Sequence, residues 1–194
     1  MTPCIEIAGA ALGLIYLALA IRENRLCWVA GAASSLLFLW VFWRVDLIMQ
    51  SLLQIYYVGI AAHAWVHWGK PKANEGEPIT RLSGREHSMA LALLVALTIA
   101  TLALRQSFAS TAAILDALTS WGGVIATWFV ARKKLDAWLY WIGIDAATVT
   151  LYLQADLLAS AALYALFTAL AFVGWREWQK SYHEQSAPPG SAHA

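Results

Sequence analysis

The sequence predicts an all-α membrane protein with seven transmembrane helices, and three observations support this fold class. Of the 194 residues, 60% are hydrophobic and 13% are charged, whereas soluble domains are about half apolar and about a quarter charged. The charged residues divide the chain into apolar segments of about 20 residues, the length of a helix that crosses a hydrocarbon core. The chain also repeats itself, so that three segments near one end match three near the other. Helices are expected because lipid offers the backbone no hydrogen-bond partner.

Charged residues set the expected limits of the spans. Arg25 and Arg44 flank the second span, Asp46 precedes the third, and Arg105 and Arg132 flank the fifth. The expected spans are residues 5–21, 26–43, 47–68, 88–104, 106–131, 137–155 and 157–175. The polar stretch GKPKANEGEPITRLSGREH after the third span is expected to form a loop. The C-terminal stretch SYHEQSAPPGSAHA is polar and rich in Ser, Ala and Pro, and we expect it to be disordered.

The lysines and arginines predict the orientation of these spans. With seven spans, one side of the membrane holds the loops after spans one, three and five together with the C-terminal tail. Eleven of the 13 basic residues fall on that side, and only Arg44 and Arg105 fall on the other. Basic loops favour the cytoplasm. We therefore expect the C-terminus to be cytoplasmic and the N-terminus to be outside.

The internal repeat has a constant offset of 110 residues and needs no gap. The offset pairs Trp28 with Trp138, Trp65 with Trp175, Trp68 with Trp178, and Asp46-Leu47 with Asp156-Leu157. It predicts a first three-helix repeat in residues 1–70, a cytoplasmic loop and connecting helix in 71–108, a second three-helix repeat in 109–180, and the tail in 181–194. Three coincident tryptophan pairs are difficult to attribute to chance, because tryptophan is rare.

The connecting helix explains the layout of three spans, one span and three spans. Three helices reverse the direction of the chain, so a fourth crossing lets both halves insert in the same orientation. Parallel repeats about an axis along the membrane normal are a transporter architecture, that of the SWEET type, and the substrate site then lies near the middle of the membrane. The alternative is a duplicated bundle that serves only as a scaffold.

One face of the sixth span carries the strongest candidate for a binding site. Asp145 lies near the middle of this span, and ionisable residues inside a membrane are expensive, so they are functional candidates. On a helix, Trp138, Trp141, Thr148 and Tyr152 share the face of Asp145. A carboxylate among aromatic rings suits a cationic organic ligand. The alternative is that Asp145 only hydrogen-bonds a neighbouring helix while the tryptophans face lipid.

Other spans supply weaker candidates. Gln50, Gln54 and Tyr57 share one face of the third span, where amides either read neutral polar groups of a ligand or tie helices together. The fifth span offers Trp121 beside Asp116, and Asp116 lies near the outer end, where interfacial water is the simpler explanation.

Several other functional classes are not supported by the sequence. His63 and His67 are spaced to share a metal, yet no third ligand is in view, so no metal is expected. The chain has no P-loop, GxSxG or HExxH motif, so we expect neither catalytic residues nor a cofactor. A formal charge of +1 without a basic run argues against nucleic acid. A membrane enzyme remains an alternative.

Three features of the chain resemble the PnuC family of bacterial vitamin transporters. They are the layout of three, one and three spans, the stretch NRLCWVAGAASSLLFLWVFWRVDLIMQSLLQIYYVGIAAHAWVHW, and the stretch LDALTSWGGVIATWFVARKKLDAWLYWIGIDAATVTLYLQADLLASAALYALFTALAFVGWREW. The resemblance covers nearly all of residues 1–180. Its most specific parts are Leu53-Gln54, the Trp138/Trp141 motif with a polar residue four positions later, and the Gly-Trp that closes the seventh span.

The resemblance implies a homotrimer in the bacterial inner membrane, whose protomers each contain a pathway. It implies facilitated diffusion of a vitamin, best known as nicotinamide riboside for NAD biosynthesis, with trapping by a separate cytoplasmic kinase. In this family the WxxW motif and the following polar residue line the substrate site, a role that carries over to Trp138, Trp141 and Asp145, and less securely to Gln54.

The chain departs from the family's pattern at two places. The third span ends in AHAW where Tyr-Gly-Trp is usual, and Asp145 replaces the Asn of some nicotinamide riboside carriers. Relatives that carry thiamine or riboflavin share the same frame. A Trp-Trp-Asp face would favour nicotinamide riboside or thiamine, which are permanent cations with flat rings, over neutral riboflavin. The face does not separate the two cations, so thiamine remains an alternative.

Overall fold

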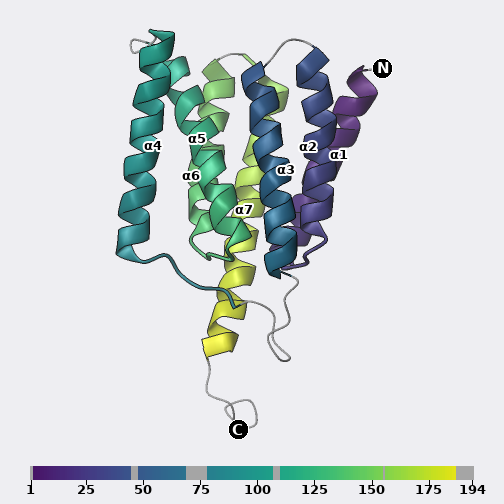
Figure 1. Ribbon diagram of the computed structural model, residues 1–194, viewed down its shortest axis with the longest axis vertical. Helices are drawn as coiled ribbons and strands as arrows, with labels where there is room; N and C mark the ends of the chain where they lie inside the picture. The colour runs from purple at the N-terminus through teal and green to yellow at the C-terminus, as the bar shows by residue number, and fades with distance from the viewer. Residues whose placement is uncertain (1, 45–47, 69–77, 107–109, 155, 187–194) are drawn as a thin grey trace. The chain divides into compact units, whose positions relative to one another are not determined.

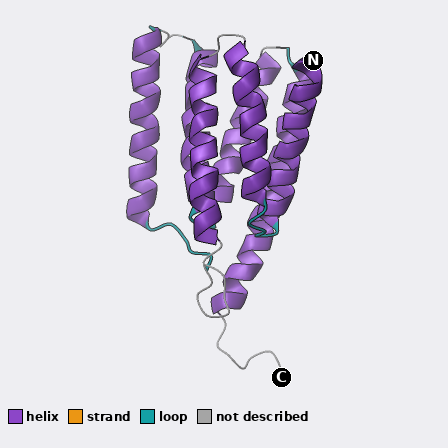
Figure 2. Cartoon of the chain, turned by 45° about the vertical axis from the view of Figure 1, so that its right-hand side comes forward, coloured by secondary structure: helices purple, strands orange, loops and turns teal. Residues whose placement is uncertain are grey.

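The computed structural model describes residues 2–44, 48–68, 78–106, 110–154 and 156–186, and within them the secondary structure is helical, apart from one isolated bridge between Thr80 and Lys134. Figure 1 labels the helices and colours them in chain order, and Figure 2 shows the same chain coloured by secondary structure. They are α1 (Thr2–Ile21), α2 (Cys27–Arg44), α3 (Ile48–Trp68), α4 (Gly84–Arg105), α5 (Thr111–Ala131), α6 (Ala137–Gln154) and α7 (Leu158–Ser186). The all-helical fold is therefore confirmed.

Four of these helices, α1, α2, α4 and α5, are long and apolar enough to cross a membrane by composition alone. The other three helices, α3, α6 and α7, contain polar side chains and aromatic side chains of low hydropathy. Helix α3 contains two glutamines and two histidines, α6 contains Asp145, and α7 continues into the polar sequence REWQKSYHEQS. These three are also the helices on which most of the polar candidate site residues lie.

The chain divides into two compact units. Residues 1–78 form the first, in which α2 packs against both α1 and α3. Residues 79–194 form the second, in which α4 packs on α5, α5 on α6, and α6 on α7. The connecting helix thus belongs to the second unit.

Helix α4 begins earlier than the sequence analysis expected. The polar stretch before span four was expected to be a loop through His87, but the helix starts at Gly84. Ser83 forms a capping box with Glu86, in which each side chain bonds the other residue's backbone N–H. This cap satisfies two orphan donors and fixes the helix start. Residues 69–77 of the expected loop lie outside the described residues.

Helix α7 also corrects the expected start of the disordered tail. The tail was placed at residues 181–194, but α7 remains helical to Ser186. Two contacts support this extension: Lys180 pairs with Glu177 at 2.7 Å, and the Gln185 side chain accepts a hydrogen bond from the Ile79 backbone at 3.0 Å. The polar composition of this segment did not indicate a helix, because the contact of Gln185 with Ile79 that holds its C-terminal end is not visible in the sequence. Residues 187–194 lie outside the described residues.

Within each unit, the local structure follows the 110-residue offset. The loop before α2 and the loop before α6 each contain a residue with positive φ, Glu23 at 54° and Lys133 at 48°. The backbone hydrogen bonds of the two loops match one for one: Asn24 donates to Leu19, and Lys134 donates to Phe129, 110 positions later in each case. Asp46 and Leu47, which the offset pairs with Asp156 and Leu157, lie outside the described residues.

The tryptophan pairs of the repeat pack alike in the two units. Trp28 meets Trp68 edge to face with ring centroids 5.4 Å apart, and Trp138 meets Trp178 in the same way at 5.5 Å. Edge-to-face packing is a favoured arrangement of aromatic rings. Tryptophan is therefore repeated at these positions because the same pair joins the second and third helices of each three-helix set.

Candidate functional site

Helix α6 buries the face that the sequence analysis singled out. Trp138, Asp145 and Thr148 are 1%, 4% and 5% exposed, while Leu139 and Ala146 on the other side are exposed. Trp141 and Tyr152 are partly buried. The spacing of three, four, three and four residues keeps all five candidate side chains on one stripe of the helix. The predicted face thus exists and is turned away from the surface.

The Asp145 carboxylate has no partner within the described part of the chain. No backbone or side-chain donor bonds it, and no cation pairs with it. Its neighbour Thr148 donates its hydroxyl proton to the Ile144 carbonyl at 2.8 Å, so this proton is not available to the carboxylate. The alternative in which Asp145 ties α6 to a neighbouring helix therefore finds no support in the described contacts. Buried polar groups without partners are rare in native proteins.

Trp138, at the N-terminal end of this face, packs closely against α7. Gly174 of α7 lies so close that a Cβ built on it would be 2.5 Å from the Trp138 ring. The Trp138 indole N–H is buried without a hydrogen-bond partner among the described residues. Because Asp145 follows Trp138 by seven residues, about 10 Å of helix separates them. Trp141, one turn from Asp145, is the nearer ring.

The other end of the face includes a residue that the sequence analysis missed. The ring of Tyr152 lies 5.2 Å from the ring of Tyr164 on α7. Tyr164 occupies the position equivalent to Gln54 under the 110-residue offset. The repeat could therefore have identified it, because a candidate in one half indicates its counterpart in the other.

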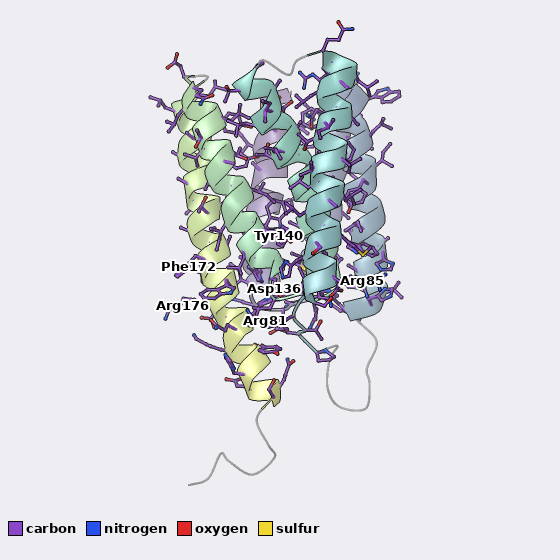
Figure 3. The ribbon with its side chains drawn as sticks, turned by 90° about the vertical axis from the view of Figure 1, so that its left-hand side faces the viewer. Arg81, Arg85, Asp136, Tyr140, Phe172 and Arg176 are labelled. Atoms are coloured by element: carbon purple, nitrogen blue, oxygen red, sulfur yellow. The ribbon has the colours of Figure 1, made fainter. Side chains whose placement is uncertain are left out.

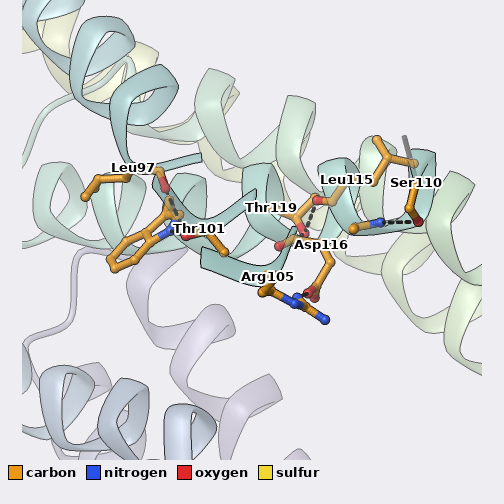
Figure 4. Close-up of polar contacts among 9 residues, drawn as sticks. Leu97, Thr101, Arg105, Ser110, Leu115, Asp116 and Thr119 are labelled. Carbon is orange, nitrogen blue, oxygen red and sulfur yellow. Dashed lines mark hydrogen bonds and ion pairs between the residues drawn. The ribbon is translucent and has the colours of Figure 1, made fainter. Parts of the chain in front are cut away.

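Trp121 of α5, a candidate from the sequence, contacts α4. Its indole N–H donates to the Thr101 hydroxyl of α4 at 2.9 Å, so the ring is engaged with the connecting helix. Asp116, also on α5, pairs with Arg105 at 2.8 Å (Figure 4), and both side chains are about half exposed. The rotation of α5, which its packing against α4 and α6 determines, sets these directions. This half-exposed ion pair agrees with the simpler explanation from the sequence, in which water solvates the Asp116 carboxylate.

The first unit has its own buried polar group. Gln54 on α3 is 9% exposed, and its side chain makes no hydrogen bond within the described ranges. Gln50 and Tyr57 on the same face are partly buried. Ser35, the equivalent of Asp145 in the repeat, is 8% exposed and uncharged. The central carboxylate is therefore a feature of the second repeat alone.

The segment before α4 holds the N-terminal end of α6 in place. Thr80 exchanges backbone hydrogen bonds with Lys133 and Leu135, and the Leu82 backbone N–H donates to the Asp136 carboxylate at 2.7 Å. Arg81 approaches the same carboxylate at 3.6 Å (Figure 3). We call residues 79–83 the strap. It fixes the turn that carries Trp138, and no pattern in the sequence indicated it.

A hollow of about 390 Å³ lies on the opposite side of α6 from Asp145. It is open and almost wholly apolar, and α4, α5 and α6 line it through residues such as Leu94, Leu118, Leu139 and Ala147. His87 and Tyr140 close one end, joined by a 3.0 Å hydrogen bond. Because the hollow holds no unpartnered polar group, we do not assign the candidate site to it.

The histidine pair of α3 shows no sign of a metal site. The His67 ring nitrogen Nδ1 bonds the His63 backbone carbonyl at 2.9 Å. No group of three metal-ligating side chains is present in the described residues.

Comparisons with known proteins agree on one family. The model of the nicotinamide mononucleotide transporter family matches residues 3–180. The riboflavin/roseoflavin transporter RibM of Streptomyces davaonensis is 26% identical over 188 residues, covering 94% of this chain and 88% of the relative. The nicotinamide riboside transporter PnuC of Escherichia coli is 22% identical over 211 residues, with the same coverage of both proteins.

The fold has a counterpart among solved structures. The crystal structure of the vitamin B3 transporter PnuC superposes with a TM-score of 0.71 at 17% identity, covering 93% of this chain and 82% of that one. At this identity the likeness concerns the fold alone. Together with the match of the family model over residues 3–180, it confirms the resemblance stated from the sequence. The chain therefore belongs to the nicotinamide mononucleotide transporter family, the PnuC family of vitamin transporters.

Proposed function

We propose that this protein is a facilitative transporter of a cationic vitamin, and that nicotinamide riboside is its substrate. The observation that carries the proposal is the Asp145 carboxylate, which is 4% exposed and unpartnered within the described residues. A buried anion without a partner is expensive. A permanent cation that enters the site would supply the missing charge.

The aromatic residues beside Asp145 support a flat cationic ring as the ligand. Nicotinamide riboside carries a pyridinium, which can stack on Trp141 while Asp145 neutralises its charge. A desolvated cation–π contact is worth about 2 kcal/mol, which corresponds to discrimination of about thirtyfold against a neutral ring. Trp138, Thr148 and Tyr152 complete the proposed site on α6. Within the first unit, we propose the face of Gln54, with Gln50 and Tyr57, as a separate polar candidate site.

Riboflavin is the second candidate, because RibM matches most of this chain. Riboflavin is neutral, so it gains nothing from an ionised carboxylate. Thiamine, a thiazolium cation, would suit the same face as nicotinamide riboside. Identities of 26% and 22% to the two named relatives do not select a vitamin, and the chemistry of the site favours a cation.

The remaining features of the proposal concern the assembly and its setting. We propose seven membrane spans arranged as parallel SWEET-like repeats of three helices around the connecting helix, with the N-terminus outside and the C-terminus in the cytoplasm. The matching loops and tryptophan pairs support the repeat. We further propose a homotrimer in the bacterial inner membrane, and a separate cytoplasmic kinase that traps the vitamin for NAD biosynthesis.

Titration calorimetry on the purified protein tests the substrate. Nicotinamide riboside, thiamine and riboflavin are compared on the wild type, on Trp141→Ala and on the control Trp128→Ala, whose ring lies on α5 under Arg132. We expect selective binding of nicotinamide riboside, weakened at least tenfold by Trp141→Ala and unchanged in the control. Selective binding of thiamine or of riboflavin would mean that this vitamin, and not nicotinamide riboside, is the substrate. Binding of none of them by folded protein would favour a scaffold or an enzyme subunit.

A further inference from the structure

We propose that the hollow between α4, α5 and α6 binds an anionic phospholipid, with one acyl chain in the hollow and the phosphate headgroup at the basic end where α4 and α6 begin. The hollow lies within the second unit, on the side of α6 away from Asp145, so this site is separate from the proposed vitamin site. Three features select this occupant: the lining of the hollow, its length, and the charge at its two ends.

The hollow has the room and the lining for a hydrocarbon chain. Its volume is about 390 Å³, and Leu94 and Leu139 are among the side chains along it. Gly143 forms part of the wall, and no atom lies within 4 Å of the position of a Cβ on this glycine. The Thr119 hydroxyl, also in the lining, donates to the Leu115 carbonyl at 2.9 Å and is satisfied within α5. This lining suits a hydrocarbon chain, whereas a polar ligand would lose its hydrogen bonds to water there.

The length of the hollow matches one leaflet of a bilayer. Its lining extends along α6 from Leu139 to Ala147, which corresponds to about 12 Å of helix. The hydrocarbon core of a membrane is about 30 Å thick, so each leaflet contributes about 15 Å. On α4 the lining runs from His87, in the first turn, to Leu94. The hollow therefore begins at one end of the two helices and ends near the middle of α6, which is the depth that one acyl chain occupies.

The end of the hollow at which α4 and α6 begin is basic. Residues 79–87 and 132–136, which form this end of the second unit, contain five lysines and arginines against two carboxylates, a net charge of +3 with the histidine neutral. Figure 3 shows Arg81 and Arg85 at this end together with Asp136. The other residues that line the hollow carry no charge. Charge complementarity therefore selects an amphiphile with an apolar chain and an anionic headgroup.

Two side chains at this end are available to the phosphate. His87 lines the hollow, and its Nδ1 shares a 3.0 Å hydrogen bond with the Tyr140 hydroxyl. When the tyrosine donates this bond, the other ring nitrogen, Nε2, carries the proton and can donate to a phosphate oxygen. Arg85 is exposed and has no ion pair or hydrogen bond among the described residues. Lys134, by contrast, is paired with Glu86 at 3.1 Å.

A second copy of the chain is the rival occupant of this apolar surface. Copies in one membrane insert in the same orientation, so a second copy would bring its own basic end to the same side. Like charges placed close together at an interface oppose association. An anionic phospholipid instead covers the apolar lining and neutralises the basic end at the same time.

Native mass spectrometry of the purified protein in detergent measures this binding. Delipidated wild type is titrated with phosphatidylglycerol, or with phosphatidylcholine of the same acyl chains. We expect preferential binding of phosphatidylglycerol at one saturable site per chain. Gly143→Leu, which fills the hollow, should lose this site. Gly59→Leu on α3, at an exposed glycine that also has no atom within 4 Å of its Cβ position, is the control and should bind like the wild type.

Arg85→Gln tests the headgroup separately. It removes one exposed charge and should lower the preference for phosphatidylglycerol about fivefold, the contribution of one basic residue near an anionic lipid surface. Arg22→Gln, at an exposed arginine of the first unit, should keep the wild-type preference. Because Arg85 makes no contact that holds the fold among the described residues, this variant tests the site even where Gly143→Leu does not fold.

Three results would overturn the phospholipid site and leave the proposed vitamin transport intact. The first is equal binding of the two lipids by the wild type, or a preference that is unchanged in either Gly143→Leu or Arg85→Gln. The second is a change in subunit number in Gly143→Leu while lipid binding stays at the wild-type level, which would mean that a second copy covers the hollow. The third is displacement of phosphatidylglycerol by glycerol phosphate, which carries the charge without a chain and would assign the basic end to a soluble phosphate.

Discussion

Two glycines of the second unit, Gly174 and Gly143, differ in what surrounds them. Gly174 of α7 lies against the ring of Trp138, where an added Cβ would be 2.5 Å from carbon atoms of the indole. Gly143 of α6 has no atom within 4 Å of the position of such a Cβ. The absence of a side chain at Gly174 is therefore what lets Trp138 pack flush against α7 and Trp178.

Because the two glycines have different surroundings, alanine at the two positions should affect the stability of the protein differently. Gly174→Ala should lower the free energy of unfolding by about 1–3 kcal/mol, because neither the helix backbone nor the fully buried indole can move away. Gly143→Ala should be neutral or slightly stabilising, because alanine is the better helix former. Thermal unfolding in detergent, followed by tryptophan fluorescence, measures both. Equal melting temperatures would show that the ring of Trp138 is free to shift.

At the scale of the elements, the strap and the α5–α6 loop behave as one structural unit. Asp136 is 5% exposed, and its carboxylate accepts the Leu82 backbone N–H while Arg81 approaches it. In the first repeat the equivalent loop uses an internal cap, with the Asn24 side chain accepting the Leu26 N–H at 2.9 Å. The same turn is thus stabilised in two different ways.

Loss of the Asp136 carboxylate should release the strap. Asp136→Ala leaves the buried Leu82 N–H without its acceptor, at a cost of about 1–3 kcal/mol. Asp136→Asn keeps an oxygen in place and should cost less. Trypsin cleavage after Arg81 reports the release, and we expect Asp136→Ala to be cut fastest. Glu177→Ala, which removes only the exposed pair with Lys180, is the control and should be cut at the wild-type rate.

The sequence contained much of the element-level description, but not all of it. Apolar segments between charges correctly located the helices. The 110-residue offset predicted a repeat, and the loops before α2 and α6 have matching backbone hydrogen bonds. The rotation of α5 could not be predicted, because packing against α4 and α6 fixes it, so the sequence did not indicate that Trp121 bonds the connecting helix. The strap depends on contacts between residues more than 50 positions apart, which no local pattern contains.

At the scale of the whole molecule, the proposed parallel arrangement of the two repeats depends on the connecting helix. Basic residues at equivalent positions of the two halves, such as Arg22 and Arg132, fall on one side of the membrane only if α4 crosses it. Helix α4 has the length and composition for that crossing. Its large side chains are mostly exposed within the chain, among them Met89, Leu93 and Ile99. Such a surface suits lipid or another apolar neighbour.

Cysteine labelling can test this topology. In a background with Cys4→Ser and Cys27→Ala, single cysteines replace Arg22, Arg132 or Gln106, all three of which are exposed. A membrane-impermeant maleimide added to intact cells should label Gln106→Cys at once and the other two only after permeabilisation. Removal of one basic residue leaves the excess of cytoplasmic charge in place. Labelling of Arg22→Cys and Arg132→Cys from opposite sides would mean that α4 does not cross, and the two halves would then be inverted instead of parallel.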